Sequence, residues 1–503
     1  MLCPMRGDSI CISLMLLTVG GIVQAQCSSW HAMSSGTDGA VWCTTRMHNG
    51  ELVVGGNFTI AGGASANRVA RWDGTSWHPL GDGFDGTVWA LATLGSGDIV
   101  AGGAFIRSGT NTIPHLARWD GVSWTTFHGG ASATVYALAT LPTGELLVGG
   151  MFAGVGGVSA SRIALWNGMS WTNLGTGVEG SVYAIAGSAR DRIYVGGNIR
   201  SPNFPHDVWN IASWDGTSWS RLGEGASARV NALALMPDGQ LVAGGDFQSI
   251  GVVNNSPGVA LWSGTDWASL GGGVRGFVNS VCIGPDGQPV IGGYFDATAA
   301  VPSVLLNRVA RWTGQHWAAM GLGVDDYVGV VAPLPGGGIL VGGNFSTSGA
   351  VPLARIGRFA SSCPASAVPH GLSCASSGGA NTLTPLTLPY LDSTFRAAGA
   401  GLPLSAQVLA ITGISPFAPG AVPLASLVPS IGQPGCDLLA SLELIAVVPA
   451  AAGIAQSALP IPGSSSLLGL ALWHQMLPIE IDAQGRLQTI TATHALRLTL
   501  GSY

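Results

Sequence analysis

The chain of 503 residues contains no lysine, and its 20 basic residues are all arginines. Charged residues of both signs make up only 9% of the sequence, and the formal net charge is −6. Proteins that bind nucleic acid neutralise phosphates with clusters of basic side chains. Because the sequence has no basic stripe, we predict that nucleic acid is not a partner.

Motifs of the common catalytic and metal sites are also lacking. There is no H-E-x-x-H, no G-x-S-x-G, no phosphate-binding loop and no EF-hand spacing. Several loops carry carboxylates that could hold Ca²⁺, although solvated surface carboxylates are the preferred interpretation. These residues are Asp82, Asp85, Glu179, Asp325 and Asp326. We therefore predict neither a cofactor nor a metal.

Long apolar runs are lacking after the N-terminus. The run Ile10–Val23 follows Arg6 and leads into Val23-Gln24-Ala25, a small-residue cleavage pattern. We interpret residues 1–25 as a secretory signal peptide cleaved after Ala25. The alternative, an N-terminal membrane anchor, would need a longer apolar run. The mature chain is expected to be secreted or at the cell surface, monomeric and without a membrane span.

Glycine is abundant, with 77 residues, and much of it belongs to a repeat. Seven times an apolar run ends in a Gly-Gly pair, at spacings of 47 to 50 residues. The pairs begin at Gly55, Gly102, Gly149, Gly196, Gly244, Gly292 and Gly342. Units of this length, built from short strand-like runs and turn residues, are typical of the blades of a β-propeller.

The second repeat illustrates four predicted strands in each blade. They are Thr87–Leu94, Asp98–Gly102, His115–Trp119 and Ser123–Phe127. The glycine pair leaves room for a neighbouring blade, because a side chain there would obstruct it. The two tryptophans that end the third strand and begin the fourth are expected to fill the outer core, where the blades diverge.

Seven glycine pairs but only six complete tryptophan pairs indicate that one blade is split between the chain ends. Ser28–Met33 matches a fourth strand, Arg355–Phe359 a third strand, and Val328–Gly343 the two innermost strands. The sequence thus predicts a closed seven-bladed propeller over residues 26–363. In this alignment Cys27 and Cys363 fall in one hairpin turn, two positions apart, so we predict a disulfide between them.

The repeat stops after Cys363. Residues 364–380 are rich in Pro, Ser and Gly and are interpreted as a linker. Residues 381–503 contain short apolar runs and are predicted to form a small β-sandwich, so that the whole protein is all-β. Leu438–Val448 could instead form a helix. Cys374 and Cys436 are predicted to pair in the oxidising compartment that export implies, whereas Cys43 and Cys282 are interpreted as small strand residues.

One position of the repeat varies while its neighbours stay apolar. It is the middle residue of the V-x-A run, which opens the innermost strand at the rim of the central channel. Going along the chain it is Trp42, Trp89, Tyr136, Tyr183, Asn231, Asn279 and Gly329. The adjacent loops carry Arg229, Arg275, Glu179 and Asp85. Aromatic rings beside polar groups could stack a sugar or hold a peptide, and the alternative is that they only fill space between blades.

The diglycine after the second strand and the outer tryptophans resemble kelch-type propellers, including the central domain of galactose oxidase-like proteins. The fuller motif, G-G-x-F followed by V-A-R-W-D-G-x-x-W and L-G-x-G, is similar to repeats of secreted bacterial propellers and fungal cortical polarity markers. The C-terminal segment, with G-Q-P-G-C-D-L-L and L-P-I-P-G, resembles a small domain that ends many secreted bacterial proteins. No histidine lies on an innermost strand, so the copper site of galactose oxidase is not carried over.

Two functions from different classes agree with the sequence. The first is an exported, non-enzymatic module for binding, adhesion or scaffolding, which presents a propeller face to a glycan or to an extracellular or surface protein. The alternative is a carbohydrate-active enzyme, a lyase or hydrolase, that works at the same mouth. An enzyme would normally show a convergent acid/base pair. The repeats contain no departure of that kind, which favours the binding module.

Overall fold

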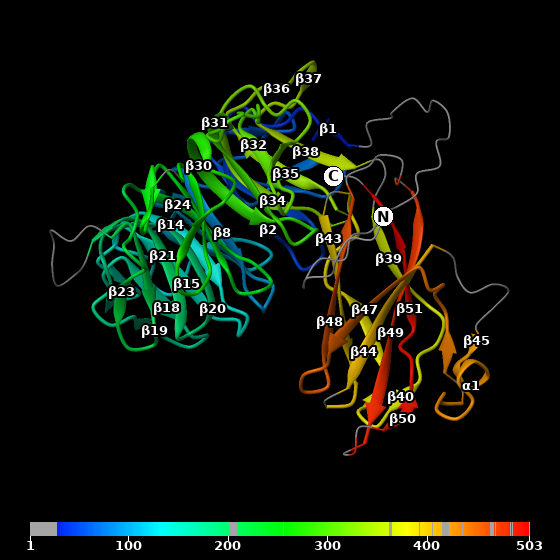
Figure 1. Cartoon of the computed structure of the whole chain (residues 1–503). Coiled ribbons are helices and arrows are strands. Elements are labelled where there is room, and N and C mark those ends of the chain that lie inside the picture. The colour runs from blue at the N-terminus through cyan, green and yellow to red at the C-terminus, as the bar shows by residue number, and fades with distance from the viewer. Residues whose placement is uncertain are drawn as a thin grey trace.

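The computed structural model describes residues 28–200, 209–254, 256–335, 337–361, 365–391, 393–404, 406–414, 422–434, 436–462, 467, 469–482, 484 and 486–501. Within these residues the chain is all-β, as predicted, and its helix α1 spans only Leu424–Leu427. Figure 1 shows the repeat region in blue to green and the C-terminal strands in yellow to red. The predicted signal peptide, residues 1–25, lies outside the described residues.

The repeat region forms seven four-stranded antiparallel sheets. From inner to outer strand, six of them are β2 (Val41–Arg46), β3 (Leu52–Gly56), β6 (Val69–Trp72), β7 (Trp77–Pro79); β8 (Val88–Thr93), β9 (Ile99–Gly103), β12 (Leu116–Trp119), β13 (Trp124–Thr126); β14 (Val135–Thr140), β15 (Leu146–Gly150), β18 (Ile163–Trp166), β19 (Trp171–Asn173); β20 (Glu179–Ala189), β21 (Arg192–Arg200), β22 (Ile211–Trp214), β23 (Trp219–Arg221); β24 (Val230–Leu235), β25 (Leu241–Gly245), β28 (Val259–Trp262), β29 (Trp267–Ser269); and β30 (Val274–Ile283), β31 (Pro289–Thr298), β32 (Val309–Trp312), β33 (Trp317–Ala319).

The seventh sheet joins the two ends of the repeat region. Its strands are β34 (Val328–Pro333), β35 (Ile339–Gly343), β38 (Ile356–Ser361) and β1 (Ser28–Ala32). Trp30 lies opposite Phe359, as the sequence alignment requires, and Ser28 lies opposite Ser361. Cys27 and Cys363 lie outside the described residues, so their disulfide remains a prediction.

The innermost strands contact one another in cyclic order, and β34 contacts β2. The first glycine of each Gly-Gly pair explains how closely they approach. A Cβ atom added at Gly55 would lie 2.6 Å from Cγ1 of Val88 in the next sheet, and one added at Gly342 would lie 2.8 Å from Cγ1 of Val41. Since real Cβ contacts of this length do not occur, glycine is required where sheets meet. The repeat region is therefore propeller-like.

The outer tryptophans link each sheet to the one before it. Each indole Nε1 donates a hydrogen bond of 2.7–3.1 Å to a backbone carbonyl just after the outermost strand of the preceding sheet. The donor–acceptor pairs are Trp30–Met320, Trp77–Met33, Trp124–Leu80, Trp171–His128, Trp219–Leu174, Trp267–Leu222 and Trp317–Leu270. We call the seven tryptophans that donate these hydrogen bonds the tryptophan belt. Because the belt is buried or half-buried and its donors are satisfied, its role is structural.

Short hairpins connect the second and third strands of several sheets. They are β4–β5 (Ile60–Ala61, Ala64–Ser65), β10–β11 (Arg107–Ser108, Asn111–Thr112), β16–β17 (Gly154–Val155, Val158–Ser159), β26–β27 (Ser249–Ile250, Val253–Asn254) and β36–β37 (Thr347–Ser348, Val351–Pro352). A carboxylate or hydroxyl from the loop before the innermost strand caps each hairpin. Asp85, for example, accepts hydrogen bonds from the backbone N–H groups of Ile106 and Arg107.

The C-terminal strands form two main sheets around one core. One sheet pairs β39 (Ser366–His370), β51 (Ala495–Thr499), β49 (Ala471–Ile481), β44 (Gln407–Gly413) and β47 (Leu444–Pro449), with β50 (Leu487–Ile490) on β49; the other pairs β42 (Thr382–Pro385), β43 (Ser393–Ala400) and β48 (Ala455–Ile461). Phe395, Val408, Met476 and Leu496 pack between the two sheets and are fully buried.

The structure differs from the sequence interpretation in one detail of this region. Residues 366–370, predicted to lie in a linker, form β39 and pair with β51. The Pro- and Ser-rich composition hid this strand, because edge strands accept proline. The segment Leu438–Val448, for which a helix was the alternative, contains the last residue of β46 (Asp437–Leu438) and most of β47, so it holds strands and no helix. Two small hairpins complete the region, β40–β41 (Ala375–Ser376, Gly379–Ala380) and β45–β46, in which β45 is Val422–Pro423.

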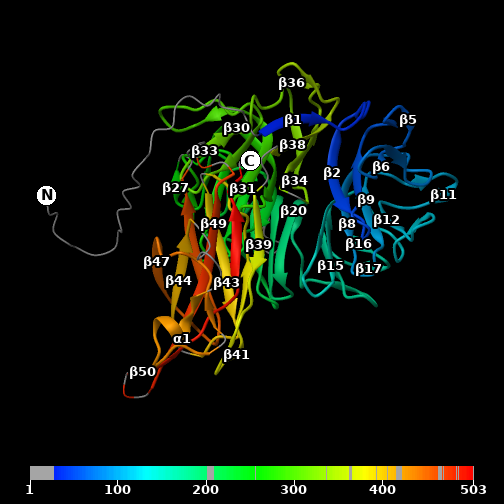
Figure 2. The same cartoon turned by 90° about the vertical axis from the view of Figure 1, so that its right-hand side faces the viewer.

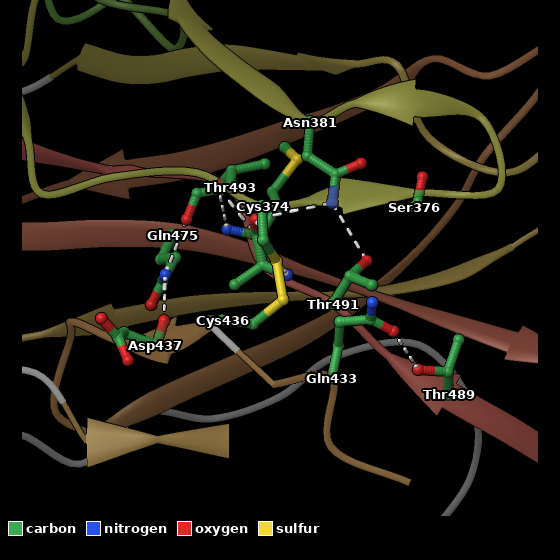
Figure 3. Close-up of a disulfide and its surroundings, with 12 residues drawn as sticks. Cys374, Ser376, Asn381, Gln433, Cys436, Asp437, Gln475, Thr489, Thr491 and Thr493 are labelled. Atoms are coloured by element: carbon green, nitrogen blue, oxygen red, sulfur yellow. Dashed lines mark hydrogen bonds between the residues drawn. A yellow bond between two sulfur atoms is a disulfide. The ribbon is translucent and has the colours of Figure 1, made fainter. Parts of the chain in front are cut away.

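The predicted disulfide between Cys374 and Cys436 is present, with a Cα–Cα distance of 5.3 Å. Figure 3 shows it beside a buried polar cluster. The Asn381 Nδ2 group donates to Thr491 Oγ1 at 3.0 Å, and Gln475, which is fully buried, donates to the backbone carbonyls of Asp437 and Thr493. The disulfide therefore joins the two small hairpins, because Cys374 directly precedes β40 and Cys436 directly precedes β46. Cys43 and Cys282 are not disulfide-bonded.

The C-terminal strands lie beside the sheet that contains β38 (Figures 1 and 2). Tyr390 is fully buried among residues of that sheet, in one cluster with Trp30 and Phe359. Its hydroxyl donates to the Gly337 carbonyl at 3.2 Å, and the Leu388 N–H donates to the Pro285 carbonyl at 3.3 Å. The two parts of the chain therefore share a core cluster and backbone hydrogen bonds.

Candidate functional site

A pocket of about 430 Å³ opens where the innermost strands begin. We call it the mouth. Every one of the seven sheets contributes a lining residue from its innermost strand, and Arg229 and Tyr327 each lie one residue before such a strand. The lining residues are Trp42, Trp89, Tyr136, Tyr183, Arg229, Asn231, Asn279, Tyr327 and Gly329. The seven variable V-x-A positions of the sequence, together with Arg229, are thus brought together at one place.

Aromatic rings form one continuous arc of the mouth. The ring centroids of Trp42 and Trp89 are 5.7 Å apart, those of Trp89 and Tyr136 6.2 Å, and those of Tyr136 and Tyr183 4.8 Å. On the other side of Trp42, Tyr327 makes an edge-to-face contact at 5.6 Å. Each ring supports the next at distances typical of aromatic pairs, and all five side chains are half-buried. The arc presents a fixed apolar surface to the pocket.

Polar groups complete the circle opposite the arc. Asn231 Nδ2 donates to Asp246 Oδ1 at 2.8 Å and lies 3.2 Å from Asn279 Oδ1. The Arg229 guanidinium pairs with Asp246 Oδ2 at 3.0 Å and lies over the Tyr183 ring at 5.3 Å. The charges of Arg229 and Asp246 therefore compensate one another, and the mouth has no uncompensated charge among these groups.

Two donors at the mouth are buried without a hydrogen-bond partner in the described structure, namely Trp42 Nε1 and Asn279 Nδ2. A buried donor with no acceptor costs about 1–3 kcal/mol. The position of Trp42 is fixed by its packing, because a Cβ atom at Gly329 would lie 2.5 Å from Trp42 Cε3. Glycine at this one V-x-A position thus accommodates the indole, and the unsatisfied donors point to a ligand that supplies acceptors.

Other residues that the sequence suggested for the mouth have different surroundings. Arg275 is not among the lining residues, and its guanidinium pairs with Asp296 at 3.0 Å. Asp85 is occupied by the hairpin that it caps. Glu179 begins β20 opposite Arg200 in the strand register. Within the described residues, no group of three or more His, Cys, Asp and Glu side chains is placed to hold a metal ion.

Tyr327 is the lining residue that the sequence interpretation missed. Burial raises its pKa to about 12, so the hydroxyl is neutral. The repeat does contain a sequence pattern that identifies Tyr327 as a lining residue. Where the V-x-A residue is aromatic, the residue before the valine is small: Ala40, Thr87, Thr134 and Ser181. Where it is Asn or Gly, that residue is large: Arg229, Phe277 and Tyr327. The two positions compensate in volume, so they need to be considered together.

Comparisons with known proteins bear on the fold of the repeat. A family model described as a domain of unknown function (DUF5122) beta-propeller matches residues 49–72, which run from the turn before β3 to the end of β6. No curated protein matches the chain. The family match and the cyclic packing of the sheets define the class: the chain contains a β-propeller.

Several solved structures are similar at low identity. The WD40 beta propeller domain of Doa1 is 12% identical, with a TM-score of 0.44, over 66% of this chain and 96% of that one. The extracellular domain of a putative one component system from B. thetaiotaomicron is 9% identical, with a TM-score of 0.33, over 90% of this chain and 69% of that one. A protein of unknown function from Dyadobacter fermentans is 14% identical, with a TM-score of 0.31, over 66% and 97%. At these values the similarities carry no argument about function. The part of the chain that the structure describes has no helix long and apolar enough to cross a membrane.

Proposed function

We propose that this protein is an exported, non-enzymatic binding module, built from a seven-bladed propeller of the kelch-like kind over residues 26–363 and a small C-terminal β-sandwich domain. The seven four-stranded sheets and their cyclic contacts support the blade number. Two sheets around one core support the sandwich. The disulfide between Cys374 and Cys436 supports an extracellular or cell-surface location, to which the signal peptide predicted from the sequence would direct the chain.

The mouth is the binding site of this module, for a glycan or for a segment of an extracellular or surface protein. The observation that carries the proposal is the convergence of seven variable side chains, one from each sheet, on a pocket with an aromatic arc and two unpartnered donors. Buried donors without an acceptor are uncommon in folded proteins, and two of them meet in this one pocket. A concave, largely apolar pocket with a few convergent polar groups is the usual form of a ligand site.

A carbohydrate-active enzyme remains the alternative at the same mouth. Glycoside hydrolysis ordinarily uses two carboxyl groups on either side of the scissile bond. Of the residues found to line the pocket, none is Asp or Glu. Two carboxylates are hydrogen-bonded to lining residues. Asp246 is shared between Asn231 and Arg229, and Asp326 accepts from the Tyr327 N–H and from Asn344 Nδ2. This arrangement gives no acid/base pair, which favours binding without turnover.

Screening the mature chain, residues 26–503, on an immobilised glycan array and on a panel of extracellular peptides tests the proposal. We expect a retained ligand that is recovered chemically unchanged after incubation. The double variant Trp89→Ala/Tyr136→Ala should lose it, whereas Met169→Ala, at an exposed turn far from the mouth in sequence, should retain it. Binding that survives the double variant would remove the mouth as the site, and cleavage of the ligand would favour the enzyme.

A further inference from the structure

The identity of the ligand can be narrowed from the chemistry of the mouth, an inference that rests on the proposed binding function. Its first constraint is shape. Residues from all seven innermost strands surround the pocket, so its outline is closed on every side. An extended peptide that lies along an aromatic groove needs an opening at both ends of the groove. A closed outline instead admits a ligand end-on, as a single ring or as the last residue of a chain.

The second constraint is the balance of donors and acceptors. Trp42 Nε1 and Asn279 Nδ2 require acceptors from the ligand. The Asn279 Oδ1 atom already lies within hydrogen-bond distance of Asn231 Nδ2, and both oxygens of Asp246 are engaged. The mouth therefore offers donors and has few vacant acceptors. A trimethylammonium group, which aromatic cages bind through cation–π contacts, carries no acceptor and would leave both donors unsatisfied.

The third constraint is charge. The Arg229–Asp246 pair is internally compensated, and Tyr327 beside it is neutral. A carboxylate or sulfate ligand would have to draw Arg229 away from Asp246 and leave that carboxylate uncompensated. An uncharged ligand leaves the pair intact. The ligand is thus expected to be neutral, rich in acceptor oxygens and apolar on one face.

We propose that the mouth binds the terminal pyranose of an uncharged glycan. One C–H face of the sugar ring stacks on the arc formed by Trp89, Tyr136 and Tyr183, and its oxygens accept hydrogen bonds from Trp42 Nε1 and Asn279 Nδ2. A pyranose combines an apolar face with a rim of acceptor oxygens. The pocket volume, about 430 Å³, is in the range of small-molecule sites of about 300–1,000 Å³.

The experiment measures affinity for soluble oligosaccharides chosen from the array, in three sets: neutral termini, termini with a uronic or sialic acid, and non-carbohydrate probes, namely choline and a proline-rich peptide. We expect binding of neutral termini only, with a Kd that is unchanged between low and high NaCl because no net charge is exchanged. Strongest binding of acidic termini, choline or the peptide, lost in Trp89→Ala/Tyr136→Ala, would overturn this inference and leave the proposed binding function standing. No mouth-dependent binding of any probe would overturn both.

Two conservative variants test the donors. Trp42→Phe keeps an aromatic face and removes Nε1–H, and Asn279→Asp keeps the acceptor for Asn231 and removes Nδ2–H. Each should weaken binding about 3- to 10-fold, the effect of one hydrogen bond. Trp89→Phe is the matched control, because its indole N–H is not among the buried unpartnered donors, and it should change Kd less than about twofold. Equal losses in Trp42→Phe and Trp89→Phe, with all melting temperatures unchanged, would show that ring area and not hydrogen bonding holds the ligand.

Discussion

The tryptophan belt and the mouth use the same residue type for different purposes. In the belt every indole N–H donates to a backbone carbonyl of the preceding sheet. In the mouth, Trp42 Nε1 is buried without a partner. Both sets lie within reach of neighbouring sheets and make aromatic contacts, so burial alone does not separate them. The hydrogen bond separates the two sets: the belt donors are satisfied within the scaffold, whereas the Trp42 donor has no partner in the described structure.

The two sets also differ in how the sequence varies. The belt repeats nearly unchanged because each sheet meets the same neighbour in the same way. The V-x-A positions meet at one axis, where seven identical large side chains would not fit, so volume must be distributed around the ring. The compensation between Trp42 and Gly329, whose added Cβ would strike the indole, is one example. Variation inside a regular repeat therefore marks the axis, and its chemistry determines what can bind there.

The largest expected difference between the belt and the mouth is in stability. Trp124 is 2% exposed and lies in the core between two sheets. Trp124→Ala should lower the free energy of unfolding by about 3–5 kcal/mol, because it leaves a large cavity. Trp89→Ala and Tyr136→Ala, at half-buried positions open to the pocket, should weaken ligand binding and leave the melting temperature nearly unchanged. Denaturant titration of the three variants and of Met169→Ala makes the comparison. If the two mouth variants unfold as early as Trp124→Ala, the mouth residues are packing between blades.

The second prediction separates the propeller from the C-terminal region. Cys374 and Cys436 are 62 residues apart in sequence, and a link of this kind typically contributes about 2–4 kcal/mol. The double variant Cys374→Ala/Cys436→Ala should destabilise the C-terminal sheets by that amount and leave the seven propeller sheets protected. Hydrogen exchange followed by mass spectrometry resolves the two parts. Equal loss of protection in the belt would contradict the separation.

The third prediction uses two buried groups that respond to acid in opposite directions. His474, in the C-terminal core between the hydroxyls of Thr412 and Ser457, has its pKa lowered to about 4 by burial. An unfolded histidine takes up a proton near pH 6.5, whereas folded His474 stays neutral down to about pH 4. His474 therefore does not reduce the free energy of unfolding above pH 6.5, and it reduces it progressively as the pH falls from 6.5 toward 4. Burial raises the pKa of Asp286 to about 6 despite Arg311 at 3.7 Å. The cost of ionising Asp286 is therefore present above pH 6 and is relieved as the pH falls toward 4.

For each group the difference in pKa between the folded and the unfolded chain corresponds to on the order of 3 kcal/mol of stability. Asp286→Asn should raise the melting temperature at pH 7.5 and change it little at pH 4.5. His474→Asn should reduce the loss of stability of the C-terminal sheets on acidification from pH 7.5 to 4.5. The same shift of Asp286→Asn at both pH values would show that its carboxyl group is not protonated in the folded chain near pH 5.

The sequence predicted those features that the repeat itself encodes. The glycine pairs, the outer tryptophans and the strand that closes the last sheet all occur at fixed spacing, and Trp30 does lie opposite Phe359. The same regularity placed Trp42, Trp89, Tyr136 and Tyr183 together. Arg275 was assigned to the mouth from its position in a loop, but a nearby carboxylate on β31 determines where its side chain lies. Such pairings depend on residues of a neighbouring strand, which spacing does not reveal.

The C-terminal region was harder to predict because it has no internal repeat. Its strand β39 is separated by more than a hundred residues in sequence from its partner β51, and a Pro- and Ser-rich composition concealed it. Tyr390, which joins this region to the propeller, also gave no signal, since a single aromatic residue in a Pro-rich segment is ordinary. Its role depends on the carbonyl of Gly337, which belongs to another part of the chain.

The smallest expected effect is the most direct test of the difference between the belt and the mouth. Trp124→Phe keeps most of a buried ring but leaves the Leu80 carbonyl without its donor, so it should cost about 1 kcal/mol beyond the lost ring volume. Trp42→Phe removes a donor that has no acceptor, so in the unliganded protein it should be neutral or stabilising by up to about 1 kcal/mol. Denaturant midpoints of both variants and of the wild type, measured without ligand, make this comparison. With saturating glycan the wild type should become more stable than Trp42→Phe, because the wild type gains binding energy that the variant lacks. A clear destabilisation by Trp42→Phe in the absence of ligand would mean that its N–H is satisfied in solution, and the distinction between scaffold and mouth would then have to rest on binding alone.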